Sequence, residues 1–237
     1  MMTSPAIVAD VLARLRATRP RVHAITNTVV QTRTADGLTA LGAVPSMTVD
    51  PEEIAEVAGA ADALLVNLGT LDRDRRTAIA MAVEHFARSS RPFVLDPVKC
   101  DIASRRLVLA REFLTQGPAL VRANAAEMRA LSPAGARLET GAVDVVSQAS
   151  RRIEVANGHP WLADVTGTGC LSGAMAAAFL AVEPDPVVAG VATAVVLGLA
   201  AEIAAERSAG PGTFSVHLLD ALATLSADHI LERARIA

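Results

Sequence analysis

The amino-acid sequence predicts a three-layer α/β fold, with a mostly parallel central sheet, helices on both faces and an antiparallel edge hairpin. Two observations carry this prediction. Short β-rich runs alternate with helical patterns along the first half of the chain, and two adjacent β-rich runs precede an all-helical C-terminal third. Strand, helix and strand at this spacing form right-handed crossovers, which make the strands parallel. Two runs joined by a short turn form an antiparallel edge instead.

The length of the chain predicts one domain. Its 237 residues suffice for one full three-layer core and are too few for two domains of ordinary size with a linker. We therefore expect a single domain over residues 1–237.

The first half of the chain supplies most of the predicted sheet. A helix is expected over Pro5–Ala17, because Ser4 and Pro5 form a helix start and the apolar residues after them share one face. The β-rich runs are Val22–Thr26, Val44–Met47, Ala63–Asn67, Phe93–Asp96 and Leu120–Asn124. The helical patterns between them cover Val29–Leu41, Pro51–Ala58, Asp72–Ser89 and Ser104–Leu114.

The pattern changes beyond Leu131. Val143–Val146 and Arg152–Val155 are the expected arms of the hairpin. The stretch Val187–Ala205 is the most apolar of the chain, but it lacks large residues and flanking charge asymmetry, so we expect a buried helix and no membrane span. The helices expected in the last third are Thr168–Val182, Pro186–Arg207 and Ser215–Ala234.

Composition excludes several classes of function. A net charge of −3, 3% aromatic residues and no tyrosine argue against nucleic acid as a partner. The N-terminus shows no basic region followed by a long apolar core, so we expect a cytoplasmic protein. Cys100 and Cys170 lie too far apart in the sequence to form a metal-ligand spacing or a disulfide framework.

Polar residues close successive β-rich runs. In open parallel sheets, ligands bind beyond the carboxyl ends of the strands. Each residue alone is an ordinary turn residue, but their joint occurrence at successive strand ends predicts one ligand site. The residues concerned are Thr26 and Asn27, Asn67 to Thr70, Asp96 and Pro97, and Asn124 with Glu127.

The sharpest local signal is the segment Asp164–Cys170, with the sequence DVTGTGC. Gly167 and Gly169 precede a helix of small residues, so the free amides of its first turn can form an anion hole for a phosphoryl group. Two readings of Cys170 stay open. Its place in the first turn favours the thiolate and a role as a base, whereas a small buried residue would only fill space.

Over nearly its whole length, the chain resembles the hydroxyethylthiazole kinases of the ribokinase-like superfamily. The most specific pieces are Val22–Asn27, Ala40–Met47, Asn67–Leu71, Val94–Pro97, Asn124 with Glu127, Asn157–Pro160 and Val165–Cys170. The resemblance implies a ribokinase-like fold and transfer of a phosphoryl group from ATP to 4-methyl-5-(2-hydroxyethyl)thiazole in thiamine salvage. It also implies Mg²⁺ and a homotrimer with substrate sites between subunits.

The resemblance further implies roles for the residues that match the family. Cys170 stands at the catalytic cysteine, with the amides of Gly167 and Gly169 around the transferring group. The thiazole-pocket positions are Asn27, Met47 and Gly167, and the nucleotide positions are Arg106, Thr140 and Asn124, with Arg105 as the alternative to Arg106. Asp96 and Glu127 resemble the carboxylates that organise Mg²⁺, which needs only one or two of them beside the nucleotide phosphates.

Two departures from the family bear on function. Lys99–Asp101 replaces a glycine-rich turn, and the family's further helix and core strand between Glu127 and Thr140 are reduced to Met128–Glu139, which leaves a stub strand at Ala136–Glu139. Three functions stay open. Residues 165–170 favour an active thiazole kinase, and the short segment together with Lys99–Asp101 favours a thiazole-binding homologue without ATP binding. The third is a kinase for another small heterocyclic alcohol, against which Asn27 and Met47 argue.

Overall fold

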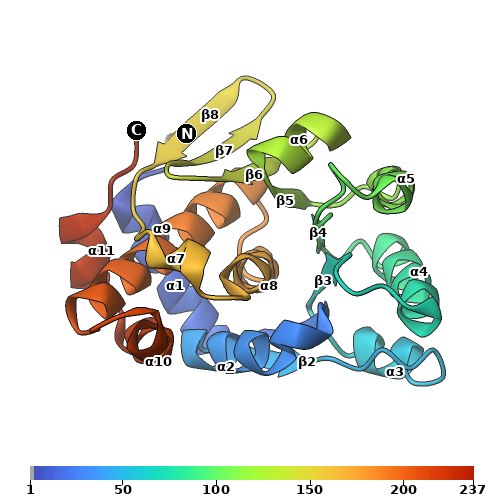
Figure 1. Cartoon of the computed structure of the whole chain (residues 1–237), viewed down its shortest axis with the longest axis horizontal. Helices are drawn as coiled ribbons and strands as arrows, with labels where there is room; N and C mark the ends of the chain where they lie inside the picture. The colour runs from blue at the N-terminus through green and yellow to red at the C-terminus, as the bar shows by residue number, and fades with distance from the viewer. Residues whose placement is uncertain (1–2) are drawn as a thin grey trace.

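The computed structural model describes residues 3–237, in which eight strands form one sheet of order β2-β1-β3-β4-β5-β6-β7-β8 (Figure 1). Strand pairs from β2 across to β6 are parallel, and β6–β7 and β7–β8 are antiparallel. The strands are β1 (Arg21–Ile25), β2 (Val44–Ser46), β3 (Ala63–Asn67), β4 (Phe93–Asp96), β5 (Leu120–Asn124), β6 (Arg137–Thr140), β7 (Asp144–Gln148) and β8 (Arg151–Val155). The predicted α/β class and its edge hairpin are confirmed.

Helices cover both faces of the sheet, and each face has its own hydrophobic core. One core is built by α1 (Pro5–Thr18), α2 (Gln31–Leu41), α8 (Thr168–Leu180), α9 (Pro186–Glu206), α10 (Pro211–Thr224) and α11 (Ala227–Arg233). The other is built by α3 (Ile54–Gly59), α4 (Arg73–Arg88), α5 (Ser104–Leu114) and α6 (Ala125–Leu131). Strand β1 divides between them, since Val22 and Ala24 belong to the first core and Ile25 to the second.

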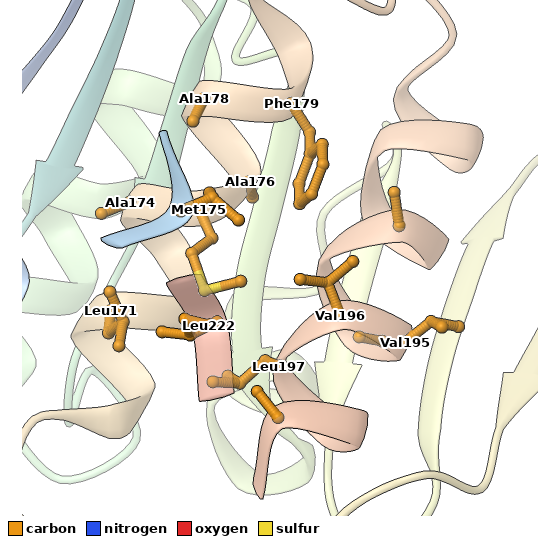
Figure 2. Close-up of a cluster of buried hydrophobic side chains, with 14 of the residues drawn as sticks. Leu171, Ala174, Met175, Ala176, Ala178, Phe179, Val195, Val196, Leu197 and Leu222 are labelled. Atoms are coloured by element: carbon orange, nitrogen blue, oxygen red, sulfur yellow. The ribbon is translucent and has the colours of Figure 1, made fainter. Parts of the chain in front are cut away.

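Helices α8 and α9 form the centre of the first core. Figure 2 shows Met175 and Phe179 of α8 beside Val196 and Leu197 of α9. Helix α9 is long and apolar enough to cross a membrane by length and composition, but 89% of its apolar window is buried inside the fold. The predicted buried helix is therefore confirmed.

The C-terminal helix expected over Ser215–Ala234 is wrong as one element. The chain instead forms α10 and α11, with a break at Leu225 and Ser226. The Ser226 side chain accepts a hydrogen bond from the His229 amide and so caps the start of α11. A serine that caps a new helix ends the preceding one, and the apolar pattern alone did not reveal this.

The short connection after β5 still completes the sheet. Helix α6, which the sequence analysis did not predict, follows β5 directly and leads into β6. Strand β6 pairs in parallel with β5 and places Thr140 opposite Asn124, and its other edge pairs with β7. The expected stub strand at Ala136–Glu139 is thus a paired strand at Arg137–Thr140. The hairpin pairs with the other edge of β6, so β5 is not left as an edge strand.

Candidate active site

The ends of β3 and β4 meet beside the first turn of α8. Asn67 and Asp96 are the last residues of β3 and β4 and lie opposite each other in the parallel register. The Asn67 Nδ2 atom donates to Asp96 Oδ2 at 2.8 Å and to Cys170 Sγ at 3.3 Å. One buried amide therefore joins β3, β4 and α8. A Cβ atom on Gly173 would lie 3.5 Å from Asp96 Oδ2, so α8 packs directly on this carboxylate.

Arg122 is a site residue that the sequence analysis missed. Its Nη1 atom lies 3.8 Å from Asp96 Oδ2, and its Nη2 atom donates to Thr140 Oγ1 at 3.0 Å. A Cβ atom on Gly169 would lie 2.9 Å from Nη2, so a larger residue there would displace the guanidinium from the α8 turn. The signal was a charged residue inside the otherwise apolar run of β5, because such residues are rarely buried without a partner.

Arg106 does not join the predicted nucleotide residues. Its Nη1 atom donates to the Val98 carbonyl at 2.9 Å. Arg105 and Arg106 line a separate cavity of about 510 Å³ between the starts of α4 and α5, together with Leu71. Arg122, and not Arg106, is therefore the arginine that lies beside Thr140.

Two adjoining cavities run from the α8 turn to the edge hairpin. The first, of about 420 Å³, is lined by Arg122, Thr140 and residues 165–169. The second, of about 430 Å³, extends over residues 157–160 and the middle of α9. Five residues line both cavities, namely Gly141, Asp144, Leu162, Ala163 and Leu197. Volumes of this order are typical of small-molecule sites.

Asp144 lines both cavities and orders the loop between them. Its Oδ1 atom accepts the Gly141 amide hydrogen at 2.9 Å and so fixes the turn between β6 and β7. Burial raises the pKa of Asp144, while the hydrogen bond from the Gly141 amide and the charge of Arg122 oppose the rise. The predicted residue Asn124 does not line either cavity, since its side chain accepts from the Ala126 and Glu127 amides and caps α6.

Asp96 is the buried carboxylate of the site. Burial raises its pKa to about 6, the nearby charge of Arg122 opposes this, and the charge of Glu127 adds to it. Its Oδ1 atom is buried and has no hydrogen-bond partner among residues 3–237. A buried acceptor without a partner is costly, so its presence at a strand end marks a place for a cation or a donor from a ligand.

Both carboxylate oxygens of Glu127 accept hydrogen bonds from backbone amides. Oε1 accepts the Lys99 amide hydrogen at 2.6 Å, and Oε2 accepts the Asn124 amide hydrogen at 3.0 Å. The first bond holds Lys99 in a left-handed conformation, with φ at 58°. Within residues 3–237, no group of three or more His, Cys, Asp or Glu side chains could hold a metal ion. A dense ligand cluster is not needed for Mg²⁺, which keeps several waters.

Cys170 lies in the first turn of α8, half-buried. Burial raises its pKa to about 11, the charge of Asp96 adds to the rise, and Arg122 opposes it. The pKa of Cys170 is thus raised, whereas the helix start alone would lower it. Desolvation and a neighbouring carboxylate outweigh the helix terminus.

Of the predicted substrate residues, Asn27 lies in a loop that closes on the α8 turn, and neither Asn27 nor Met47 lines the two cavities above. Asn27 Oδ1 accepts from the Val29 amide and from Thr70 Oγ1, at 3.0 and 2.9 Å. A Cβ atom on Gly69 would lie 2.8 Å from Asn27 Nδ2, so the two loops touch there.

Gly167 continues this contact on the side of α8. It has φ at 98°, and a Cβ atom there would lie 2.8 Å from Val30 Cγ1. The loop that begins at Asn27, which contains the short helix η1 (Thr28–Val30), therefore closes on the α8 turn. Met47 follows β2 and packs, partly buried, against the core that contains α8.

Comparisons with known proteins identify the family. The hydroxyethylthiazole kinase family matches residues 12–139 and 134–228, two segments that meet in the short connection to β6. The chain is 50% identical to a probable hydroxyethylthiazole kinase of Agrobacterium fabrum, over 96% of this chain and 94% of that protein. It is 41% identical to a hydroxyethylthiazole kinase of Granulibacter bethesdensis, over 94% and 92%.

Solved structures agree in fold. A hydroxyethylthiazole kinase protein from Pyrococcus horikoshii matches with a TM-score of 0.94 and 36% identity, over 97% of this chain and 98% of that one. A ribokinase-like superfamily protein from Enterococcus faecalis matches with a TM-score of 0.63 and 15% identity, which shows a shared fold alone. The fold is ribokinase-like, and the chain belongs to the hydroxyethylthiazole kinase family.

Proposed function

We propose that this chain transfers the γ-phosphoryl group of ATP to the hydroxyl of 4-methyl-5-(2-hydroxyethyl)thiazole. The observation that carries the proposal is the meeting of Asp96, Arg122 and Cys170 at the glycine-rich start of α8. A free carboxylate oxygen, a guanidinium and open backbone amides are the groups that position and stabilise a transferring phosphoryl group. The relatives that are named as this kinase support the same reaction.

The two adjoining cavities favour an active kinase over a homologue without ATP binding. The phosphates would lie beside Arg122, Thr140 and the Gly167–Gly169 turn, and the base would lie in the second cavity. This requires that the short connection does not remove the wall of the site. Strand β6 supports this, because its pairing with β5 keeps Thr140 and Gly141 next to Arg122.

Asp96 fits the Mg²⁺ ion that a kinase uses. Its buried Oδ1 atom is the unpaired acceptor that a hard cation would satisfy. When bound, the ion would neutralise charge on the transferring phosphate. Glu127 has both oxygens bonded to backbone amides, so it would act through its charge and through its hold on the Lys99 turn.

Cys170 would orient the hydroxyl of the substrate. A thiol with a pKa near 11 is protonated at neutral pH, so it acts as a hydrogen-bonding group and not as a ready base. Phosphoryl transfer passes through a loose transition state, in which the attacking oxygen needs positioning more than early deprotonation. Asn67 holds the sulfur in place with its amide group.

We also propose that the chain assembles as a cytoplasmic homotrimer with substrate pockets between subunits. Val29, two residues from Asn27, is 72% exposed at the edge of the predicted pocket. An apolar side chain there suits a pocket that a second subunit completes. Sedimentation velocity of the purified chain would test the assembly, since a monomer at micromolar concentration contradicts it.

The decisive experiment is an ADP-release assay with ATP, Mg²⁺ and the thiazole alcohol. We expect ADP only when the alcohol is present, in equal amount to the phosphorylated product. A thiazole that lacks the hydroxyl is the matched control and should give none. If the alcohol binds in calorimetry but no ADP forms, the chain is a binding homologue. If neither occurs, the thiazole assignment is wrong.

A further inference from the structure

His23 is a fully buried histidine that the proposed reaction does not use. It lies in β1, opposite Ser46 of the edge strand β2. Its Nδ1 atom is 2.8 Å from Ser46 Oγ, and its Nε2 atom is 3.1 Å from the Thr48 carbonyl oxygen. The second bond reaches beyond the last residue of β2. One ring therefore holds the chain on both sides of Met47.

The two contacts define the state of the ring. The Thr48 carbonyl oxygen can only accept, so Nε2 carries the hydrogen, and Nδ1 accepts from the Ser46 hydroxyl. Burial lowers the pKa of His23 to about 4. The ring is thus neutral and in one tautomer at physiological pH.

The side chains of His23 and Met47 lie on opposite faces of the sheet. Ile25, two residues after His23 in β1, belongs to the core of α3 and α4, so His23 points to that face. Met47 packs against the opposite core, which contains α8. Residues alternate sides along an extended chain, so holding Ser46 and Thr48 from one face turns Met47 toward the other.

The segment needs such a hold because of its place in the sheet. Strand β2 has three residues, forms the edge of the sheet and includes Pro45, which cannot donate to a ladder. Its three register pairs with β1 end at Ser46. The ring of His23 continues the attachment for two more residues.

From this geometry we propose that His23 is a positioning residue of the substrate pocket, which fixes Ser46–Thr48 so that Met47 faces the alcohol. The inference rests on the proposed function, and on the resemblance by which Met47 is expected to contact the thiazole. It adds that the affinity for the alcohol depends on a residue that does not touch it.

Three variants test the proposal by the kinetics of both substrates. His23→Phe keeps the volume and removes both bonds, and we expect it to raise KM for the alcohol about tenfold, the scale of one or two lost hydrogen bonds. KM for ATP should change less than twofold. His23→Gln retains a donor for Thr48 and should restore most of the affinity. Ile25→Val, on the same face of β1, is the matched control and should leave both KM values unchanged.

A spectroscopic readout separates this proposal from the proposed function. With ¹³C-methyl methionine, the Met47 signal is assigned by its loss in Met47→Leu. We expect it to shift when the alcohol is added to the wild type, and to move toward the value of a mobile side chain in His23→Phe before any ligand is added.

Two results overturn the proposal. One is a His23→Phe protein with the wild-type KM for the alcohol and an unmoved Met47 signal. The other is an equal rise of KM for both substrates, which would make His23 a general structural residue. A wild type that neither binds nor phosphorylates the alcohol defeats the proposed function instead. The Met47 signal of the free His23→Phe protein would then decide whether the ring still positions this segment.

Discussion

Arg122 and Asp96 form an ion pair between neighbouring strands, with 3.8 Å between Nη1 and Oδ2. The pair leaves each partner free on one side. The guanidinium lies over the α8 turn at Gly169, and Asp96 Oδ1 has no hydrogen-bond partner among residues 3–237. Arg122 could thus bind a phosphate while Asp96 binds its metal ion close by, as a metal-bound phosphate requires.

Replacing Arg122 should impair the use of ATP far more than replacing Arg106. We expect Arg122→Met to lower kcat/KM for ATP at least a hundredfold, the scale of one lost electrostatic donor at a reacting phosphate. Arg106→Met, which removes only a bond to the Val98 carbonyl, is the matched control and should stay within threefold of the wild type. Steady-state kinetics with varied ATP measures both. A larger loss in the Arg106 variant would restore the assignment made from sequence.

Replacing Cys170 should affect turnover more than binding. Cys170→Ala is expected to lower kcat about a hundredfold, the scale of a misplaced reacting group, while the calorimetric Kd for the alcohol stays within threefold of the wild type. Cys170→Ser keeps a hydrogen-bonding group and should retain more activity than the alanine variant. Because the thiol has a raised pKa, iodoacetamide should alkylate it slowly at pH 7. Unchanged turnover in the alanine variant would leave the α8 amides and Arg122 as the main catalysts.

The raised pKa of Asp96 predicts a dependence of Mg²⁺ binding on pH. Burial raises the pKa of the Asp96 carboxyl to about 6, and the metal would bind the ionised form, so apparent Mg²⁺ affinity should fall about tenfold per pH unit below 6. Activity titrations with Mg²⁺ at pH 5, 6 and 7 measure this. Asp96→Asn should lose most activity at every pH. An apparent Mg²⁺ affinity that does not change between pH 5 and 7 would place the metal elsewhere.

The paired strand β6 predicts that the base of ATP contributes to binding. With Mg²⁺ present, a non-hydrolysable ATP analogue should bind at least tenfold more tightly than tripolyphosphate, because the second cavity offers the base a wall. Isothermal titration calorimetry compares the two ligands. Equal affinities would mean that only the α8 turn holds the nucleotide, and the binding homologue would then be preferred.

His23 predicts part of the acid sensitivity of the fold. Its folded-state pKa is near 4 and its ordinary value is 6.5. Because His23 takes up a proton more readily in the unfolded chain, the free energy of unfolding decreases as pH falls from 6.5 toward 4. The decrease is about 2.5 kcal/mol at pH 4.5. Asp96, whose pKa is raised, works in the opposite direction between about pH 4 and 6. Urea unfolding at pH 7 and 4.5 should therefore show a smaller acid loss in His23→Phe than in the wild type, and an equal loss would contradict this.

The strand ends were predictable because parallel strands bring their last residues to one edge of the sheet. Asn67, Asp96 and Thr140 follow from that rule together with the resemblance to the family. Helix α6 could also have been predicted, since Asn124 and Glu127 form a capping box. The Asn-x-x-Glu pattern is present in the sequence, but we assigned both residues to ligands.

Other features depended on contacts between distant segments. The charge of Arg122 is supported by Asp96 and Thr140 from other strands, and sequence spacing does not show such partners. The pKa of Cys170 follows from burial and from Asp96, so the local argument from the helix start pointed in the wrong direction. His23 likewise looks like an ordinary core residue until Ser46 and Thr48 are placed beside it.

The order of the strands has a consequence for how the site comes into being during folding. From β3 to β8, neighbours in the sheet are also successive strands in the chain, so this part can form through short loop closures. Asn67 and Cys170 are 103 residues apart, and their contact forms only when α8 docks on the sheet. On refolding, recovery of secondary structure should precede recovery of kinase activity. A nascent chain that does not yet include α8 would have Asn67 and Asp96 at the strand ends but would lack Cys170, and it would be inactive.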